Sequence, residues 1–422
     1  MTDIVDELKW RGLIALSTDE DALRKAFADG PVTFYCGFDP TAPSLHIGNL
    51  VQLITMRHIQ NAGNFPLPLV GGATGLIGDP RPTSERTLND PETVAAWVLR
   101  LRGQVERFLD FEGPHAAQIV NNLDWTSGMS AISLLRDIGK YFRVNTMIAK
   151  EAVARRLNSD AGISYTEFSY QVLQGMDYLE LNRRYGCTLQ TGGSDQWGNL
   201  TAGTELIRKA EGKSVHALGT PLITKADGTK FGKTEGGAIW LDAEMTSPYA
   251  FYQFWLNADD RDVANFLRIF TFRSQEEIEE LERQTVEKPA ARTAQRALAE
   301  DVTALVHGQE QLDRAIAASR ALFGQGDLGE LDAATLDAAV AELPQVQVGE
   351  LASIVDLLAA TGLVPSKSAA RRAVKEGGAY LNNAKVTDEE AAPTTADLLH
   401  GRWLLLRRGK RSLAAVELVP TA

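Results

Sequence analysis

Hydrophobic and polar positions follow two alternating patterns in the first half of the chain. The β-rich run VTFYC at residues 32–36 is followed by the turn letters GFDP. Residues 46–61 carry apolar side chains at the spacing of one helix face, and Gly63 is placed to end that helix. The run PLPLV at residues 66–70 indicates the next strand. This strand–helix–strand succession predicts a parallel, doubly wound sheet.

Further segments extend the same alternation. The later strand candidates are residues 118–120, 188–190 and 221–224. Helical patterns lie between them, notably at residues 132–137 and 169–184. The expected fold class is therefore α/β, with a doubly wound parallel-sheet domain over residues 1–235.

The second half of the chain has a different composition. Residues 274–322 are rich in Ala, Glu, Gln, Leu and Arg, a helical composition that is interrupted near Pro289. We expect an α-helical domain at residues 236–325, a linker at 326–349 and a small α+β domain at 350–422. The length of 422 residues agrees with two or three domains.

Charge and cysteine content narrow the class of protein. The net charge is −12, but residues 350–422 hold ten Lys/Arg and eight Asp/Glu, a net of +2, which leaves −14 for the remainder. Attraction to phosphate depends on such local differences. Cys36 and Cys187 have neither disulfide nor metal-ligand spacing, so we expect a reducing, cytoplasmic compartment and no bound metal. The acidic N-terminus and the absence of a long apolar run argue against secretion and membrane association.

The first candidate for chemistry is DPTAPSLHIGN at residues 39–49, which joins a strand to a helix. A helix start offers unpaired N–H groups and a positive dipole end, both suited to phosphate. Gly48 leaves room for a flat base or ribose, and His46 adds a donor. Taken alone, the segment is more typical of a capped helix with an ordinary partnered histidine.

The second candidate is KADGTKFGKT at residues 225–234. Lys230 and Lys233 stand among glycines in what we expect to be a mobile basic loop, able to neutralise charge as pyrophosphate leaves. The segment is not a P-loop, because Gly228 and Gly232 are separated by three residues rather than four. A solvated surface turn is the alternative interpretation.

Two glycine-rich turns follow other strands, GGSDQWGN at residues 192–199 and GGATGLIGD at residues 71–79. Ligands of open α/β sheets gather at the carboxyl ends of strands near the switch point, where an acid and an amide could hold a ribose and a carboxylate. The second turn does not fit G-x-G-x-x-G, so no nicotinamide cofactor is inferred. Structural turn glycines remain an alternative for both.

A polar stripe is the last candidate in this half. Tyr170, Gln174 and Asp177 fall at i, i+4 and i+7, on one side of a helix. Such a stripe is usually a solvated face unless it faces a pocket.

Together and in this order, the segments resemble the bacterial tyrosyl-tRNA synthetases, class I enzymes with a Rossmann-type catalytic domain. HIGN is similar to the family's HIGH motif and KFGKT to its KMSKS motif. The runs YCGFDPTAPSLHIGN, GGATGLIGDP, TEFSYQVLQGMDY and GGSDQWGN are also similar. The resemblance extends from about residue 30 to the C-terminus, and the ordered set is far more specific than either short motif.

The resemblance implies that L-tyrosine reacts with ATP to give tyrosyl-adenylate and pyrophosphate, and that tyrosine is then transferred to the 3′ end of tyrosine tRNA. ATP would be a substrate that carries Mg²⁺, with no protein-bound metal or organic cofactor. The family is usually homodimeric. The chain departs from the family at Asn49, which replaces the last HIGH histidine, and in the loop RPTSER, where we expect Arg81 and Arg86 to replace lysines.

The resemblance also implies roles for single residues. Those implied to bind tyrosine are Tyr35, Asp79, Asn122, Tyr170, Gln174, Asp177 and Gln196. Those implied to bind ATP are Cys36, Gly37, Asp39, Thr41, His46, Gly48, Asn49, Gly193, Asp195, Lys230 and Lys233. Those implied to act in catalysis, by stabilising the pentacoordinate α-phosphate and the leaving pyrophosphate, are His46, Asn49, Lys230, Lys233 and Thr234.

The C-terminal run LVPSKSAARRAVKEGGAYLNNAKV, with GRWLLLRRGKR after it, resembles the ribosomal-protein S-four-like RNA-binding module. The implied tRNA-binding residues are Lys367, Arg371 and Arg372 along a helix, and Arg407, Arg408, Lys410 and Arg411 at a sheet edge. A single basic run is usually a solvated face, whereas the whole module pattern favours RNA binding.

Three other interpretations stay open at this point. A tryptophan enzyme of the same class is the nearest, and the pair of Asp177 and Tyr35 argues against it because an indole presents no hydroxyl there. A small-molecule nucleotidylyltransferase would not need the basic C-terminal segment. An RNA-binding regulator with an inactive synthetase core would not need His46 and the two lysines.

Overall fold

The computed structural model describes residues 3–81, 84, 87–160, 162–229, 231–234, 237–410 and 412–419. The chain forms two compact units, one of Met1–Met245 with Asp259–Ala294 and one of Thr246–Ala258 with Gln295–Ala422. These two units do not coincide with the domains expected from the sequence, whose limits were placed near residues 235 and 325. Those domain limits stay a prediction.

The first unit is built on a six-stranded sheet in the order β1-β6-β5-β2-β3-β4. Its strands are β1 Leu16–Ser17, β2 Thr33–Phe38, β3 Phe65–Val70, β4 Val120–Asn121, β5 Leu189–Gly193 and β6 His216–Thr220. The strands β2 to β6 pair in parallel, and β1 is antiparallel to β6. The chain moves outward from β2 to β3 and β4 and then returns to β5 and β6 on the other side. This is the predicted doubly wound topology, with its switch point between β2 and β5.

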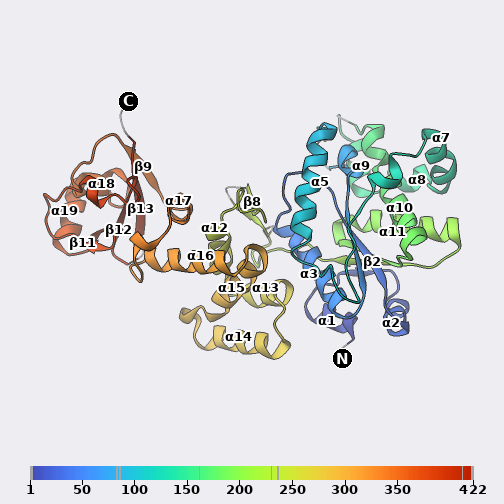
Figure 1. The fold of residues 1–422 in the computed structure, drawn as a ribbon, viewed down its shortest axis with the longest axis horizontal. Helices are drawn as coiled ribbons and strands as arrows, with labels where there is room; N and C mark the ends of the chain where they lie inside the picture. The colour runs from blue at the N-terminus through green and yellow to red at the C-terminus, as the bar shows by residue number, and fades with distance from the viewer. Residues whose placement is uncertain are drawn as a thin grey trace. The chain divides into compact units, whose positions relative to one another are not determined.

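Helices cover both faces of this sheet (Figure 1). One face is covered by α3 (Ile47–Asn61) and α5 (Pro91–Val105), which contact β2 and β3. The other is covered by α10 (Tyr165–Tyr185) and α11 (Trp197–Glu211), whose Met176 and Leu206 pack with Tyr35 and Leu69. Burial on both faces explains why the strands form near-continuous apolar runs rather than alternating ones.

Short elements connect these parts of the first unit. Between β4 and α10 lie α6 Leu123–Thr126, α7 Ala131–Ser133, the π-helix η1 Leu134–Ile138, η2 Gly139–Tyr141, α8 Val144–Ile148 and α9 Glu151–Leu157. Elsewhere lie α1 Ile4–Trp10, α2 Glu20–Asp29, α4 Thr74–Ile77, η3 Ser194–Gln196, β7 Lys233–Thr234, β8 Gly237–Ala238, α13 Val263–Phe270, α14 Gln275–Glu287 and η4 Pro289–Ala291.

One strand prediction was wrong. Residues 221–224 form no strand of the sheet, and the strand is β6, immediately before them. The sequence of β6, HALGT, contains Ala and Gly, which have low strand propensity, yet all five residues are buried. Pro221 cannot donate to a ladder and ends the strand.

The second unit contains a five-stranded sheet in the order β11-β10-β12-β13-β9. Its strands are β9 Gln345–Val348, β10 Ala379–Leu381, β11 Ala384–Lys385, β12 Trp403–Arg408 and β13 Ser412–Leu418. Its helices are α12 Pro248–Leu256, α15 Thr293–His307, α16 Gln309–Leu322, η5 Leu328–Glu330, α17 Ala333–Ala341, α18 Ile354–Ala360, α19 Lys367–Lys375 and η6 Thr395–Asp397.

Alternate residues of β12 enter two different cores, as the period of a strand requires. Leu404 and Leu406 pack with α18 and α19. Trp403 and Leu405 pack instead with residues of α12, α16 and α17. The sheet is therefore covered on both faces.

The linker expected at residues 326–349 is instead ordered. It contains η5, α17 and β9, and β9 pairs in parallel with β13. Leu336 and Val340 are fully buried in the core that contains Trp403. The stretch is low in aromatic residues, but its alanines and leucines supply a packing face. Within the described part of the chain, no helix is both long and apolar enough to cross a bilayer.

Candidate active site

Four segments singled out from the sequence meet at the carboxyl edge of the first sheet. Residues 39–49 follow β2, residues 71–79 follow β3, and residues 192–199 span the end of β5. The polar stripe of α10 lies against the same sheet. The edge is the crevice at the switch point, where open α/β sheets bind ligands.

The stripe on α10 is not a solvated face. Tyr170 and Asp177 are 6% and 2% exposed. The Asp177 carboxylate accepts hydrogen bonds from Trp125 Nε1 at 2.9 Å and from Asn122 Nδ2 at 3.0 Å. Burial raises the pKa of Asp177 to about 7, and the two hydrogen bonds act in the opposite direction.

Tyr35 lies beside Asp177 with its hydroxyl in the interior. The side chain is 1% exposed, and its ring centroid lies 5.1 Å from that of Tyr178. Burial, with the nearby Asp177 charge, raises the pKa of Tyr35 well above its ordinary value. Within the described residues, neither the Tyr35 hydroxyl nor Gln174 Oε1 has a hydrogen-bond partner. Buried polar atoms without partners mark a place that a polar ligand can complete.

Asp39 joins this group to the segment that precedes α3. Its carboxylate accepts from the Tyr170 hydroxyl at 2.6 Å and from Thr74 Oγ1 at 2.6 Å. Thr74 Oγ1 in turn accepts from Asn122 Nδ2 at 2.9 Å. Asp39, implied to lie by the ATP phosphates, therefore shares one network with residues implied to bind tyrosine. Gly71 is required here, because a Cβ would overlap both Asp39 Oδ1 and Thr74 Oγ1.

A second network surrounds Asp79. Its carboxylate accepts from Gln196 Nε2 at 3.2 Å and from Asn199 Nδ2 at 3.1 Å. Lys150 Nζ donates to Asn199 Oδ1 at 2.7 Å, and burial lowers the pKa of Lys150 to about 7 although Asp79 opposes the change. The sequence analysis assigned no role to Lys150 or Asn199. Asn199 ends the GGSDQWGN run, whereas no local pattern distinguishes Lys150.

His46 is the N-cap of α3. Its Nδ1 accepts from the Gly48 N–H at 3.0 Å, and Asn49 Oδ1 accepts from the His46 N–H at 3.1 Å, which completes a capping box. An accepting Nδ1 makes Nε2 the N–H donor of the neutral ring. A Cβ at Gly48 would lie 2.8 Å from His46 Cε1, so the cap itself requires this glycine.

The KFGKT segment lies against the start of α3. The Ile239 N–H donates to the Gly232 carbonyl, and the Ile47 N–H donates to the Ile239 carbonyl. Gly232 has a φ of 79°, and a Cβ there would overlap Ile47. The structure therefore brings the KFGKT and HIGN motifs together.

Phe231 anchors this segment to α13. Its ring centroid lies 4.5 Å from that of Phe266 and 5.3 Å from that of Phe270. The backbone of Lys233 and Thr234 forms β7, which pairs with β8. Lys230 lies outside the described residues, and so does Arg86.

Four of the residues implied to bind ATP lie on the central strands β2 and β5 or directly after β5. Cys36 pairs with Thr191 across β2 and β5, and Gly37 follows it in the same strand. Burial raises the pKa of the Cys36 thiol to about 12, so it is not an ionised nucleophile. A Cβ at Gly193 would overlap Asp195 Oδ1, so this glycine lets the carboxylate lie over the end of β5.

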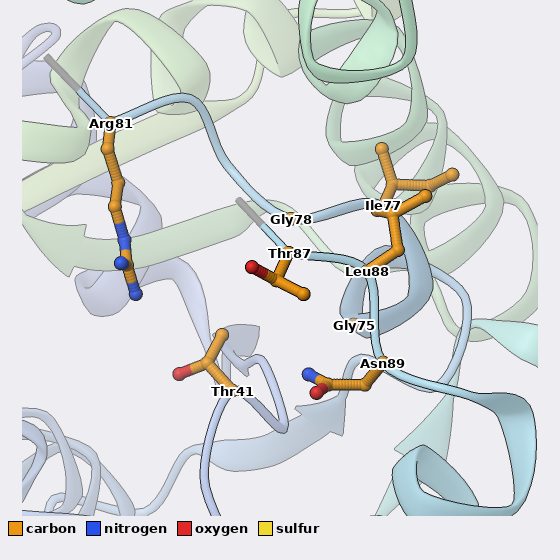
Figure 2. Close-up of a pocket in the computed structure, with 8 residues that line it drawn as sticks. All are labelled: Thr41, Gly75, Ile77, Gly78, Arg81, Thr87, Leu88 and Asn89. Carbon is orange, nitrogen blue, oxygen red and sulfur yellow. The ribbon is translucent and has the colours of Figure 1, made fainter. Parts of the chain in front are cut away.

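A pocket of about 190 Å³ lies beside Thr41. Its lining residues are Thr41, Gly75, Ile77, Gly78, Arg81, Thr87, Leu88 and Asn89. Figure 2 shows the Arg81 and Asn89 side chains extending toward Thr41. A cation, hydroxyls and an amide around one hollow suit a phosphate group. Among the described residues, no three His, Cys, Asp or Glu side chains are grouped as metal ligands.

The residues implied to bind tRNA lie on α19, in β12 and directly after β12. Arg371 and Arg372 are exposed on α19, and Lys367 pairs with Asp356 at 2.7 Å. Arg407 covers the Tyr380 ring, with its Cζ 3.9 Å from the centroid, and Arg408 donates to the Leu363 carbonyl at 3.3 Å. Lys410 is exposed, and Arg411 lies outside the described residues.

The fold and the site together define a class I aminoacyl-tRNA synthetase. Residues 28–324 match the family model described as tRNA synthetases class I (W and Y). Residues 335–416 match the model described as Tyrosine–tRNA ligase SYY-like C-terminal domain.

Comparison with similar proteins identifies the kind of enzyme within this class. A tyrosine–tRNA ligase of Streptomyces avermitilis is 77% identical over 99% of both chains, and one of Streptomyces griseus is 73% identical over 100% of both. The chain therefore belongs to the tyrosine–tRNA ligases. A C-terminally truncated mitochondrial tyrosyl-tRNA synthetase of Coccidioides posadasii is 31% identical with a TM-score of 0.66, covering 75% of this chain and 91% of that one. Tyrosyl-tRNA synthetase of Archaeoglobus fulgidus, solved with L-tyrosine, shares the fold at 16% identity and a TM-score of 0.56, covering 74% of this chain and 100% of that one.

Proposed function

We propose that the protein activates L-tyrosine with ATP and transfers it to the 3′ end of tyrosine tRNA. The observation that carries this proposal is the network around Asp39. It connects the buried pair of Tyr35 and Asp177 to the segment that caps α3 with His46. A phenol and a nucleotide phosphate can therefore be held in one pocket.

Tyr35 and Asp177 select the amino acid. The phenolic hydroxyl of tyrosine donates to Asp177 and accepts from the Tyr35 hydroxyl, whose oxygen has no partner in the described structure. Phenylalanine leaves both groups unpaired in a buried site, which is a strong basis for rejection. Tryptophan presents no hydroxyl to them.

The other tyrosine groups are held nearer the strand ends. Asp79, Tyr170 and Gln174 bind the ammonium group, and Asn122 supports Asp177. Gln196 lies beside Asp79 and guides the carboxylate.

ATP is the second substrate and brings Mg²⁺ with it. Cys36, Gly37, Gly193 and Asp195 border the ribose. Gly48 leaves room for the base or ribose, and Thr41 and Asp39 lie by the phosphates. The pocket around Thr41 and Arg81 receives the pyrophosphate end.

The tyrosine carboxylate attacks the α-phosphorus in line, so that a carboxylate O–P bond forms as the bond to pyrophosphate breaks. The carboxylate is already a nucleophile, and orientation and charge stabilisation therefore provide the acceleration. His46, Asn49, Lys230, Lys233 and Thr234 stabilise the charge on the α-phosphate and the leaving group.

Transfer to tRNA uses the second unit as well. The terminal ribose hydroxyl of the tRNA attacks the tyrosyl carbonyl, and AMP leaves. The contacts to the tRNA backbone come from Lys367, Arg371, Arg372, Arg407, Arg408, Lys410 and Arg411. The basic face of α19 and the end of β12 support this assignment. The reaction takes place in the cytoplasm, in agreement with two unpaired thiols.

The active form is a homodimer. The short helices between β4 and α10, together with the first residue of α10, expose large apolar side chains that would be covered by a second copy of the chain. These are Leu123, Ile132, Leu135, Val144, Ile148, Leu157 and Tyr165, of which Ile132 and Tyr165 are both 71% exposed. Sedimentation of the parent protein and of an Ile132→Asp variant tests this, because only the parent should sediment as a dimer.

ATP–pyrophosphate exchange with tyrosine, tryptophan and phenylalanine tests the central proposal. Exchange that depends on tyrosine, followed by charging of tyrosine tRNA, is expected. Exchange with tryptophan alone would identify the other enzyme of this class. A nucleotidylyltransferase would exchange without any amino acid, and an inactive regulator would not exchange at all.

A further inference from the structure

A buried ion pair lies outside the residues assigned so far. Arg156 Nη2 on α9 lies 2.9 Å from Glu167 Oε2 in the first turn of α10, and the two side chains are 0% and 1% exposed. Removing two charges from water costs several kcal/mol for each, and an apolar pair of similar size is often equally stable or more stable. Stability alone therefore does not account for this pair.

The other N–H groups of Arg156 donate to the backbone. Nη1 donates to the Arg81 carbonyl at 3.2 Å, and Nε donates to the Gly162 carbonyl at 2.9 Å. Arg81 lies two residues after Asp79 and lines the pocket beside Thr41 (Figure 2). One planar guanidinium thus fixes the loop after β3 and the turn before α10 at the same time.

Glu167 connects this arginine to the helix that carries the stripe. Tyr170 lies three residues further along α10, next to Glu167 on the same side of the helix. The buried pair therefore links the loop of Asp79 and Arg81 to the helix of Tyr170, Gln174 and Asp177.

We propose that Arg156, held by Glu167, is a positioning residue for ATP. It fixes the loop that carries Asp79 and Arg81 relative to α10, so that the phosphate pocket stays in register with the bound tyrosine. This inference rests on the proposed function. A displacement of about 1 Å in a positioning group can reduce the rate by about a hundredfold. The effect should fall on ATP more than on tyrosine, because the carbonyl held is that of Arg81.

The double variant Arg156→Met/Glu167→Leu tests this role in the full-length protein. It removes both charges and keeps similar side-chain volumes, so no unpaired charge is left in the interior. Urea unfolding, equilibrium tyrosine binding and ATP–pyrophosphate exchange at varied ATP are measured. We expect an unfolding midpoint and a tyrosine Kd near those of the parent, and a kcat/KM for ATP about 10- to 100-fold lower.

Arg155→Met is the matched control, because Arg155 is the neighbouring arginine on α9 but is 63% exposed and pairs with Glu151. It should leave all three measurements unchanged. Arg156→Lys keeps the buried charge without the planar fork, and it should fold and lose kcat/KM for ATP. A parent-like value for ATP in either Arg156 variant, or an equal loss in tyrosine binding, would overturn the positioning role.

The parent protein distinguishes this inference from the proposed function. If the parent shows no tyrosine-dependent exchange, the proposed function itself is wrong. If the parent exchanges and the Arg156 variants do so equally well, only the positioning role is wrong.

Discussion

The carboxyl of Asp177 combines deep burial with two strong donors, and this makes the protein sensitive to pH. Its pKa is raised from 3.8 to about 7 because burial disfavours the charged form. Between these values the folded protein binds the proton more tightly than the unfolded chain does. This group therefore favours folding at low pH, and its contribution is lost as pH rises to about 7.

Asp177→Asn should remove this part of the pH dependence. The free energy of unfolding of the variant, minus that of the parent, should increase between about pH 4 and pH 8. The increase has an upper limit of about 4 kcal/mol, since one pKa unit corresponds to about 1.4 kcal/mol. Urea titrations of the unliganded proteins measure it, and a constant difference across this range would contradict the burial argument.

The proposed contact between Asp177 and the tyrosine hydroxyl makes tyrosine binding depend on the same carboxyl in the opposite sense. The ionised form is the stronger acceptor for a phenol, so the affinity for tyrosine should rise as pH increases through about 7. Isothermal titration of the parent over this range measures it. The Asn variant should bind more weakly and without that dependence, and a flat profile for the parent would refute the assignment of Asp177 to the hydroxyl.

Gly71 supports the Asp39 network through the absence of a side chain. Because a Cβ would overlap Asp39 Oδ1 and Thr74 Oγ1, Gly71→Ala should push these groups apart and destabilise the fold by about 1–3 kcal/mol. Tyrosine-dependent exchange should fall by more than the loss of folded protein explains. Gly103→Ala is the matched control, since nothing lies within 4 Å of its Cβ position in α5. It should be neutral or slightly stabilising, and equal effects at both positions would argue against the network.

At the scale of single elements, the start of α3 has a structural role and a proposed chemical one. His46 caps the helix through Nδ1, and in the proposed mechanism its Nε2 donates to the α-phosphate. Asparagine is a good N-cap without an imidazole, so His46→Asn should keep the stability of the parent, whereas His46→Ala should lose about 1 kcal/mol. Both variants should slow the exchange reaction by about 100- to 1,000-fold. Activity that returned with the Asn cap would mean that His46 acts only as a cap.

The elements predicted from the sequence are those with strong local patterns. β2, α3, β3 and α10 were expected because each combines apolar periodicity with a cap or a turn. β6 was missed because burial on both faces lets a strand tolerate Ala and Gly. Residues 333–341 were taken as part of a linker because their composition lacks aromatic residues, and only their contact with β12 reveals a packed helix.

Site residues could likewise be predicted only where a local sequence pattern marked them. The spacing of Tyr170, Gln174 and Asp177 predicted that they share one side of a helix. It did not predict that this side is buried. No sequence pattern pointed to Lys150, because its place in the site depends on a hydrogen bond to Asn199, which is distant in the sequence. The Arg156–Glu167 pair is likewise a contact between two helices, and neither helix has a local sequence pattern that predicts it.

At the scale of the whole molecule, the second unit has a core that crosses the limits of both family models. The matches end at residue 324 and begin again at residue 335. Yet Leu322 of α16 and Leu336 of α17 pack in one core with Leu405 of β12. Truncation in this interval would therefore expose apolar surface on α16. Point substitutions on exposed basic residues are a cleaner way to separate tRNA binding from tyrosine activation.

Arg371 and Arg372 offer that separation, because both are exposed on α19 in the second unit while the residues proposed to bind tyrosine belong to the first. The double variant Arg371→Ala/Arg372→Ala should leave ATP–pyrophosphate exchange unchanged and raise the KM for tRNA in the charging reaction. Each phosphate contact removed should also lower the slope of log affinity against log salt by about one, because fewer counterions are released on binding. Arg24→Ala is the control, since this arginine pairs with Asp3, Asp6 and Glu20 in the first unit. A charging reaction with the parent's KM and salt dependence would mean that the positive face of α19 is only a solvated surface.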